Sequence, residues 1–127
     1  MSAPHHLFVC TSCRVAGETN QQGTPRSGSV LFENLAERYA NWARRESFVI
    51  LPYECLSVCK RACGFAFRAP GKFTYVFGDA KPRETESAII ECAKLYRHAA
   101  TGFLAREERP PALRAGILAR VPPVETP

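Results

Sequence analysis

The spacing of the cysteines constrains this chain more than any other feature of its sequence. Three of the six cysteines lie in one short stretch, at Cys55, Cys59 and Cys63, each four residues after the one before. A second group, the C-x-x-C pair of Cys10 and Cys13, lies close to the N-terminus. Thiolates gathered in such groups are typical ligands of a metal ion or an iron–sulfur cluster. The chain is therefore expected to fold so that the two groups meet.

The composition favours one globular domain in a reducing compartment. An apolar content of 46% in 127 residues suits a single hydrophobic core, and 23% charged residues argue against a disordered chain. The longest apolar runs are far below the roughly 20 residues of a membrane span, and the N-terminus lacks the pattern of a signal peptide. We therefore expect a cytoplasmic protein, in which clustered cysteines bind metal or carry out redox work more often than they form disulfides.

The charge pattern indicates which partners to expect. The net charge is +5 and is spread along the chain, without the basic block interleaved with aromatic residues that nucleic-acid binding favours. A basic surface of this kind attracts an acidic partner protein. Lys60 and Arg61 lie inside the cysteine stretch and are the predicted docking residues. The alternative is that both are solvated loop charges with no binding role.

Apolar patterns predict four strands and two helices. The expected strands are 7–10, 48–51, 64–68 and 73–77, and the expected helices are 30–45 and 84–99. Ser27 or Ser29 is the expected cap of the first helix. A strand–helix–strand start implies a parallel pair with a right-handed crossover, and the Pro-Gly hairpin adds two antiparallel strands. The result is an α/β fold, a four-stranded mixed sheet with flanking helices, as in thioredoxin.

The whole chain, residues 1–127, is expected to form one domain. Its core is predicted to span about residues 5–100, followed by a proline-rich extension over about residues 101–127. Between the proline pairs of that extension, four apolar residues could form a short helix: Leu113, Ile117, Leu118 and Val121.

The predicted topology brings the cysteines to one edge of the sheet. Cys10 ends the first strand, and Cys55 and Cys59 follow the second, so the two loops converge if these strands are parallel. Four thiolates can hold a 2Fe–2S cluster or one tetrahedral zinc ion. The C-x-x-x-C spacing favours the cluster, as do the apolar residues around it, and zinc is the alternative. Those apolar residues are Leu56, Val58, Phe65 and Phe67.

Three of the cysteines, Cys10, Cys13 and Cys92, have other possible roles. Cys10 and Cys13 could form a thiol–disulfide active site, but such a motif normally opens a helix, and here a loop rich in Gly, Asn and Gln follows. Cys92 lies on the apolar face of the second helix and is predicted to be a core residue. The sequence contains no Ser-His-Asp set, H-E-x-x-H motif or phosphate loop in the right context. We therefore expect that the protein is not an enzyme.

Four segments carry a resemblance to a known family. They are Cys-Thr-Ser-Cys at 10–13, Glu-Cys-Leu-Ser-Val-Cys-Lys-Arg-Ala-Cys at 54–63, the hairpin Ala-Pro-Gly-Lys-Phe-Thr-Tyr-Val-Phe-Gly-Asp at 69–79, and Arg-Pro-Pro-Ala-Leu-Arg at 109–114. The chain resembles the DUF1636 family of predicted metal-binding proteins nearly end to end. That family is itself similar to the thioredoxin-like 2Fe–2S ferredoxins.

The resemblance implies a one-electron carrier with a 2Fe–2S cluster, often homodimeric, and linked with cobalamin biosynthesis as an electron donor. It implies Cys10, Cys55 and Cys59 as ligands. The better-known ferredoxins place their second cysteine near the start of the first helix, where this chain has none. Cys13 is therefore the expected fourth ligand, and Cys63 is the alternative.

Overall fold

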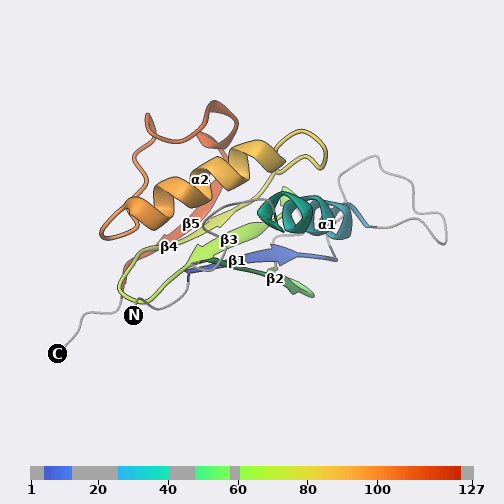
Figure 1. The fold of residues 1–127 in the computed structure, drawn as a ribbon, viewed down its shortest axis with the longest axis horizontal. Coiled ribbons are helices and arrows are strands. Elements are labelled where there is room, and N and C mark those ends of the chain that lie inside the picture. Colours follow the sequence, from blue (N-terminus) through green and yellow to red (C-terminus); the bar gives the residue numbers. More distant parts are fainter. Residues whose placement is uncertain (1–4, 13–25, 41–47, 58–60, 124–127) are drawn as a thin grey trace.

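A five-stranded mixed sheet with two helices forms the fold (Figure 1). The computed structural model describes residues 5–12, 26–40, 48–57 and 61–123. The sheet order is β2-β1-β3-β4-β5. In chain order the elements are β1 (His5–Cys10), α1 (Ser27–Ala40), β2 (Phe48–Tyr53), β3 (Phe65–Arg68), β4 (Thr74–Phe77), α2 (Glu86–His98), the 3₁₀ helix η3 (Pro111–Leu113) and β5 (Ile117–Val121).

Strand β1 lies between β2 and β3 and decides the topology. It pairs in parallel with β2 and antiparallel with β3. Its side chains alternate, so Leu7 and Val9 are fully buried while His6 and Phe8 are partly exposed. This alternation is typical of a strand with one face on a core. The predicted parallel pair of the first two strands is therefore confirmed.

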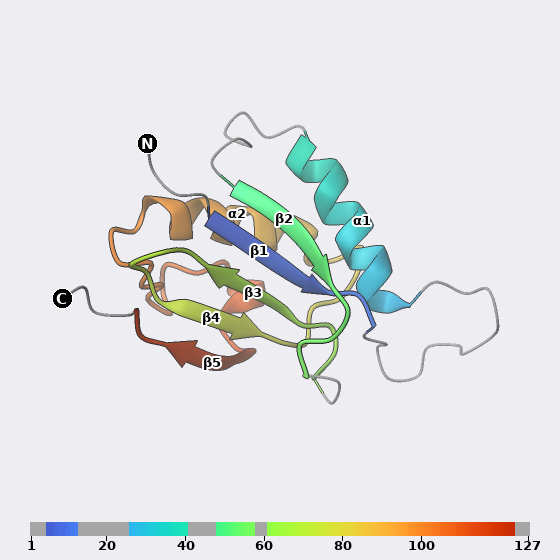
Figure 2. The ribbon, with the colours of Figure 1, turned by 90° about the horizontal axis from the view of Figure 1, so that it is seen from below.

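Both helices pack on the same face of the sheet (Figure 1). Leu31 and Leu35 of α1 and Ile89 of α2 are fully buried there, in a core that also contains aromatic side chains of β3 and β4. Within that aromatic layer, the rings of Phe65 and Phe77 stack with centroids 4.9 Å apart. Burying side chains of this size contributes about 1.5–3 kcal/mol each. Seen from the opposite side, none of the described helices covers the sheet (Figure 2).

The predicted strands and helices are present, with shifted ends. Helix α1 begins at Ser27, so the two predicted caps, Ser27 and Ser29, lie within the helix. Residues 41–45 of the predicted helix lie outside the described residues. Helix α2 agrees closely with the prediction. Among the described residues, no helix is long and apolar enough to cross a membrane.

The C-terminal segment differs from the prediction. The predicted short helix is wrong, because Ile117–Val121 forms a fifth strand, β5, antiparallel to β4, and the sheet therefore has five strands and not four. The apolar spacing suits a helix, but Gly116 at φ +111° and Pro122 leave too few residues between them for a stable one. The exposed edge of β4 offers hydrogen bonds instead. The same segment buries Leu104 and Leu113 in the core, so it is more than an extension.

Candidate metal centre at the end of the parallel strands

The two cysteine loops meet where β1 and β2 end. Cys10 is the last residue of β1, and its partner in the parallel ladder is Tyr53, the last residue of β2. The amide of Thr11 donates a hydrogen bond of 2.9 Å to the carbonyl of Tyr53. The Cys10 Sγ lies 3.9 Å from the carbonyl oxygen of Glu54, to which the thiol donates. The chain segments that follow β1 and β2 are therefore held side by side, as predicted.

Cys55 is the exposed cysteine of this edge. The backbone amide of Ser57 donates to the Cys55 Sγ over 3.3 Å. Ser57 adopts a left-handed conformation at φ +63°, which a residue other than glycine seldom takes. That turn points the amide at the sulfur. An amide donor to sulfur stabilises a thiolate and tunes the potential of a bound cluster.

Cys63 approaches the same edge from a third segment. It is fully buried, and its backbone exchanges two hydrogen bonds with Ala80, of 3.3 and 3.1 Å. The carbonyl of the next residue, Gly64, accepts the amide of Cys10 over 3.0 Å. The backbone around Cys63 is thus joined directly to the end of β1. Cys63 as an alternative ligand stays a prediction.

Part of the predicted site falls outside the described residues. Cys13, Cys59, Lys60 and Val58 are in that group, so their roles stay predictions. Within the described ranges, no three or more His, Cys, Asp or Glu side chains gather closely enough to hold a metal ion. The donors that are described fit thiolate coordination, because Cys10 and Cys55 offer one buried and one exposed soft ligand at one edge.

The start of helix α1 packs directly on the backbone of Cys10. A Cβ on Gly28 would lie 1.9 Å from the Cys10 carbonyl oxygen, so only glycine fits there. The Ser29 hydroxyl donates to the Thr11 carbonyl over 3.2 Å, and the Arg26 guanidinium donates to the Ser12 carbonyl over 3.0 Å. The first turn of α1 is therefore fixed against the backbone of residues 10–12. Ser27 and Ser29 are recognisable in the sequence as possible caps, whereas nothing in the sequence marks Gly28 as a contact of Cys10.

Arg61, a predicted docking residue, is engaged with Asp79. Its Nε lies 2.9 Å from each of the two carboxylate oxygens of Asp79. This hydrogen-bonded pairing lowers the pKa of the Asp79 carboxyl below its usual range and raises the pKa of Arg61. Asp79 is the last residue of the hairpin segment 69–79, but the sequence alone does not show that it pairs with Arg61. Docking by Arg61 stays a prediction.

With this geometry in view, the comparisons with known proteins identify the family. The sequence profile of a family described as "Protein of unknown function (DUF1636)" matches residues 7–123. The chain belongs to the DUF1636 family. A comparison with curated proteins found no match.

Solved structures show which fold this DUF1636 chain shares. It is similar to a thioredoxin-like [2Fe-2S] ferredoxin from Aquifex aeolicus, with a TM-score of 0.59 and 20% identity over 97% of this chain and 98% of that one. Two cysteine-to-serine variants of that ferredoxin give TM-scores of 0.56 at 19% and 18% identity, each over 91% of this chain and 98% of that one. The predicted thioredoxin-like fold is confirmed.

Cys92 of the DUF1636 chain is a residue of the hydrophobic core. It is fully buried on the inner face of α2, among the residues of the hydrophobic core. Burial raises the pKa of its thiol to about 12. The prediction that Cys92 is a core residue is confirmed.

This difference predicts selective alkylation of the metal-free protein. At pH 8 a thiol with a pKa of about 12 is ionised in about one molecule in ten thousand. We expect iodoacetamide to label the exposed Cys55 within minutes and to leave Cys92 unlabelled until the protein is unfolded. Peptide mass spectrometry measures both. Labelling of Cys92 as fast as Cys55 in the folded protein would contradict its placement in the core.

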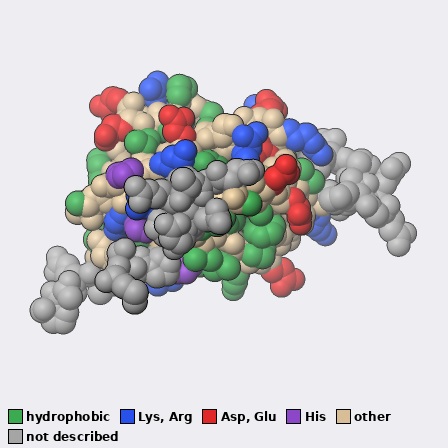
Figure 3. Space-filling view, viewed as in Figure 1, with side chains coloured by type: hydrophobic (Ala, Val, Ile, Leu, Met, Phe, Trp, Pro, Cys, Tyr) green, Lys and Arg blue, Asp and Glu red, His purple; other side chains and the backbone are tan. Residues whose placement is uncertain are grey.

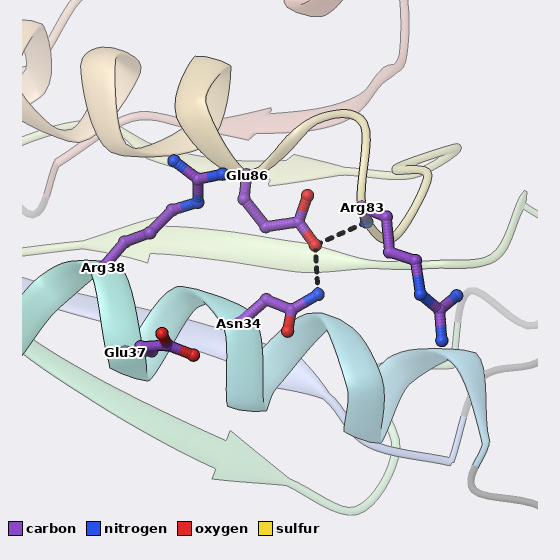
Figure 4. A pocket seen from close by; sticks show the side chains of 5 residues that line it. All are labelled: Asn34, Glu37, Arg38, Arg83 and Glu86. Carbon is purple, nitrogen blue, oxygen red and sulfur yellow. Dashed lines mark hydrogen bonds between the residues drawn. The ribbon is translucent and has the colours of Figure 1, made fainter.

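A cavity of about 440 Å³ lies between α1 and α2 of the DUF1636 chain (Figure 4). The buried carboxylate of Glu86 accepts hydrogen bonds there from the Asn34 side chain over 2.8 Å and from the Arg83 amide over 2.6 Å. Arg38 of α1 donates to the Ser87 hydroxyl of α2 over 2.9 Å. These bonds join the two helices, so this cluster positions α1 against α2.

Proposed function

We propose that this chain is a one-electron carrier that binds a 2Fe–2S cluster through Cys10, Cys13, Cys55 and Cys59. The observation that carries the proposal is the meeting of Cys10 and Cys55 at one sheet edge, with the Ser57 amide donating to the Cys55 sulfur. The likeness in fold to a thioredoxin-like [2Fe-2S] ferredoxin supports it. Thiolates in two groups suit such a cluster, which takes four cysteine ligands.

The described residues have separable roles in this proposal. When bound, the cluster supplies a one-electron couple. Cys10 is fully buried and binds on the side of the protein interior, where water is excluded. Cys55 is exposed and binds on the side that a redox partner can approach. The Ser57 amide stabilises the negative charge of the Cys55 thiolate, and the start of α1 fixes the backbone of Cys10.

This role needs no acid–base chemistry, so we propose a carrier and not an enzyme. Within the same proposal, the carrier is a cytoplasmic homodimer that delivers electrons to an acidic partner in cobalamin biosynthesis. The net charge of +5 supports the acidic partner. The resemblance stated above supports the homodimer and the cobalamin link.

Metal and sulfide analysis of protein purified without air tests the proposal. We expect a red-brown protein with about two iron and two sulfide per chain and a visible spectrum that bleaches and returns on reduction and reoxidation. A colourless protein with about one zinc per chain would support the structural zinc site instead. A metal-free protein with a reversible disulfide between Cys10 and Cys13 would support the thiol–disulfide alternative.

A further inference from the structure

We infer that Asp79 is a positioning residue for the cysteine loop: by pairing with Arg61 it fixes residues 61–63 against the chain that follows β4. The inference rests on the proposed function for what the loop binds. The placement of residues 61–63 is independent of any ligand and can be tested without one.

The Arg61 guanidinium and the Asp79 carboxylate form a bidentate ion pair. The Arg61 Nε is 2.9 Å from both carboxylate oxygens of Asp79, and the Arg61 Nη2 also donates to Oδ2. A guanidinium held in this way has a fixed direction as well as a fixed distance. Asp79 takes a left-handed backbone conformation, φ +63°, which aspartate adopts more readily than most residues other than glycine.

The backbones of the two segments are joined as well. The Asp79 amide donates to the Arg61 carbonyl over 2.8 Å, and the next residue, Ala80, exchanges two hydrogen bonds with Cys63. Three backbone bonds therefore join residues 61–63 to residues 79–80, next to the ion pair. We call these three bonds and the ion pair the latch.

Gly78 lets the two segments approach this closely. A Cβ at that position would lie 2.5 Å from the Arg61 carbonyl oxygen and 2.8 Å from the Arg61 Cβ. The Gly78 amide donates in turn to the Gly116 carbonyl over 2.8 Å, just before β5. The latch is thus tied on one side to the cysteine loop and on the other side to the last strand of the sheet.

The ion pair of the latch is exposed to solvent. The side chains of Arg61 and Asp79 are 51% and 46% exposed, and ion pairs in such positions add little to the free energy of unfolding. The pair nevertheless holds one short segment, residues 61–63. Its effect is therefore expected to be local: ligand geometry at a metal centre depends on the shell that supports the ligands.

Hydrogen exchange in the metal-free protein tests the latch directly. We expect Asp79→Asn and Arg61→Gln each to speed exchange of the Cys63 and Ala80 amides about two- to fivefold, the size of the coupling in an exposed ion pair. The double variant should be no worse than either single variant, because the same interaction is lost once. Glu84→Gln is the matched control: it removes the same charge from a nearby exposed carboxylate and should leave both amides unchanged.

Loaded protein tests the connection to the ligands. We expect both single variants to release iron to a chelator faster, whereas their reduction potentials should move in opposite directions, since one removes a negative and the other a positive charge. The paired reversal Arg61→Asp with Asp79→Arg should restore slow release.

Three outcomes would overturn the inference. They are unchanged amide exchange in Asp79→Asn, equal effects in Glu84→Gln, and faster exchange with normal iron release. A chain that binds no iron would refute the proposed function, while amide exchange would still decide whether the latch exists.

Discussion

Replacing Cys55 with serine is expected to remove the cluster. Iron and sulfide should fall from about two of each per chain to background, and the visible spectrum should disappear. Serine offers a hard, neutral oxygen in place of a thiolate, and it loses the sulfur that accepts the Ser57 amide. Analysis of anaerobically purified protein measures the loss. Because Cys55 is exposed, the fold should persist, and circular dichroism checks this.

Cys92→Ala is the control for this experiment. It also removes one thiol, but from the core, so full iron content is expected with a small loss of stability. Normal iron content in Cys55→Ser would mean that Cys55 is not a required ligand. Iron analysis of Cys13→Ser and Cys63→Ser would then show whether Cys63 completes the set.

Gly28→Ala is expected to destabilise the fold by about 3 kcal/mol. The added Cβ would lie 1.9 Å from the Cys10 carbonyl oxygen and 3.1 Å from the Thr11 carbonyl carbon. Both atoms belong to the backbone, so relief requires that α1 move away from the end of β1. Urea unfolding should show a lower midpoint at an unchanged slope.

Gly71→Ala separates this clash from the conformational preference of glycine. Gly71 has φ +72°, and a Cβ there would meet nothing within 4 Å. We expect a cost of about 1 kcal/mol from the left-handed backbone alone. If Gly28→Ala cost no more than Gly71→Ala, the close packing of α1 on Cys10 would be refuted.

Local patterns in the sequence were sufficient to predict strands β1 to β4 and the edge where cysteines meet. Short apolar runs mark β1 and β2, and the crossover rule makes them parallel, which places Cys10 and Cys55 together. Strand β5 was missed because the apolar spacing of Ile117–Val121 fits a helix. Its conformation depends on the free edge of β4, which is a tertiary feature.

The supporting contacts of the site were not predictable for a related reason. Gly28 looks like any glycine before a helix until the Cys10 carbonyl is placed against it. Asp79 ends a hairpin, and only the folded chain shows that Arg61 is its partner. Each contact joins residues that are distant in sequence, whereas periodicity and turn chemistry describe neighbours.

The position of β1 between β2 and β3 has a consequence for the order of events during synthesis. The ribosome makes this strand first, but its partners β2 and β3 are made later, and β5, which completes the sheet, is made last. Such non-local pairing is slow to form and waits for most of the chain. Cys10 therefore reaches its buried position only after Gly64 has been translated. Until then, the nascent chain carries it as an unprotected thiol.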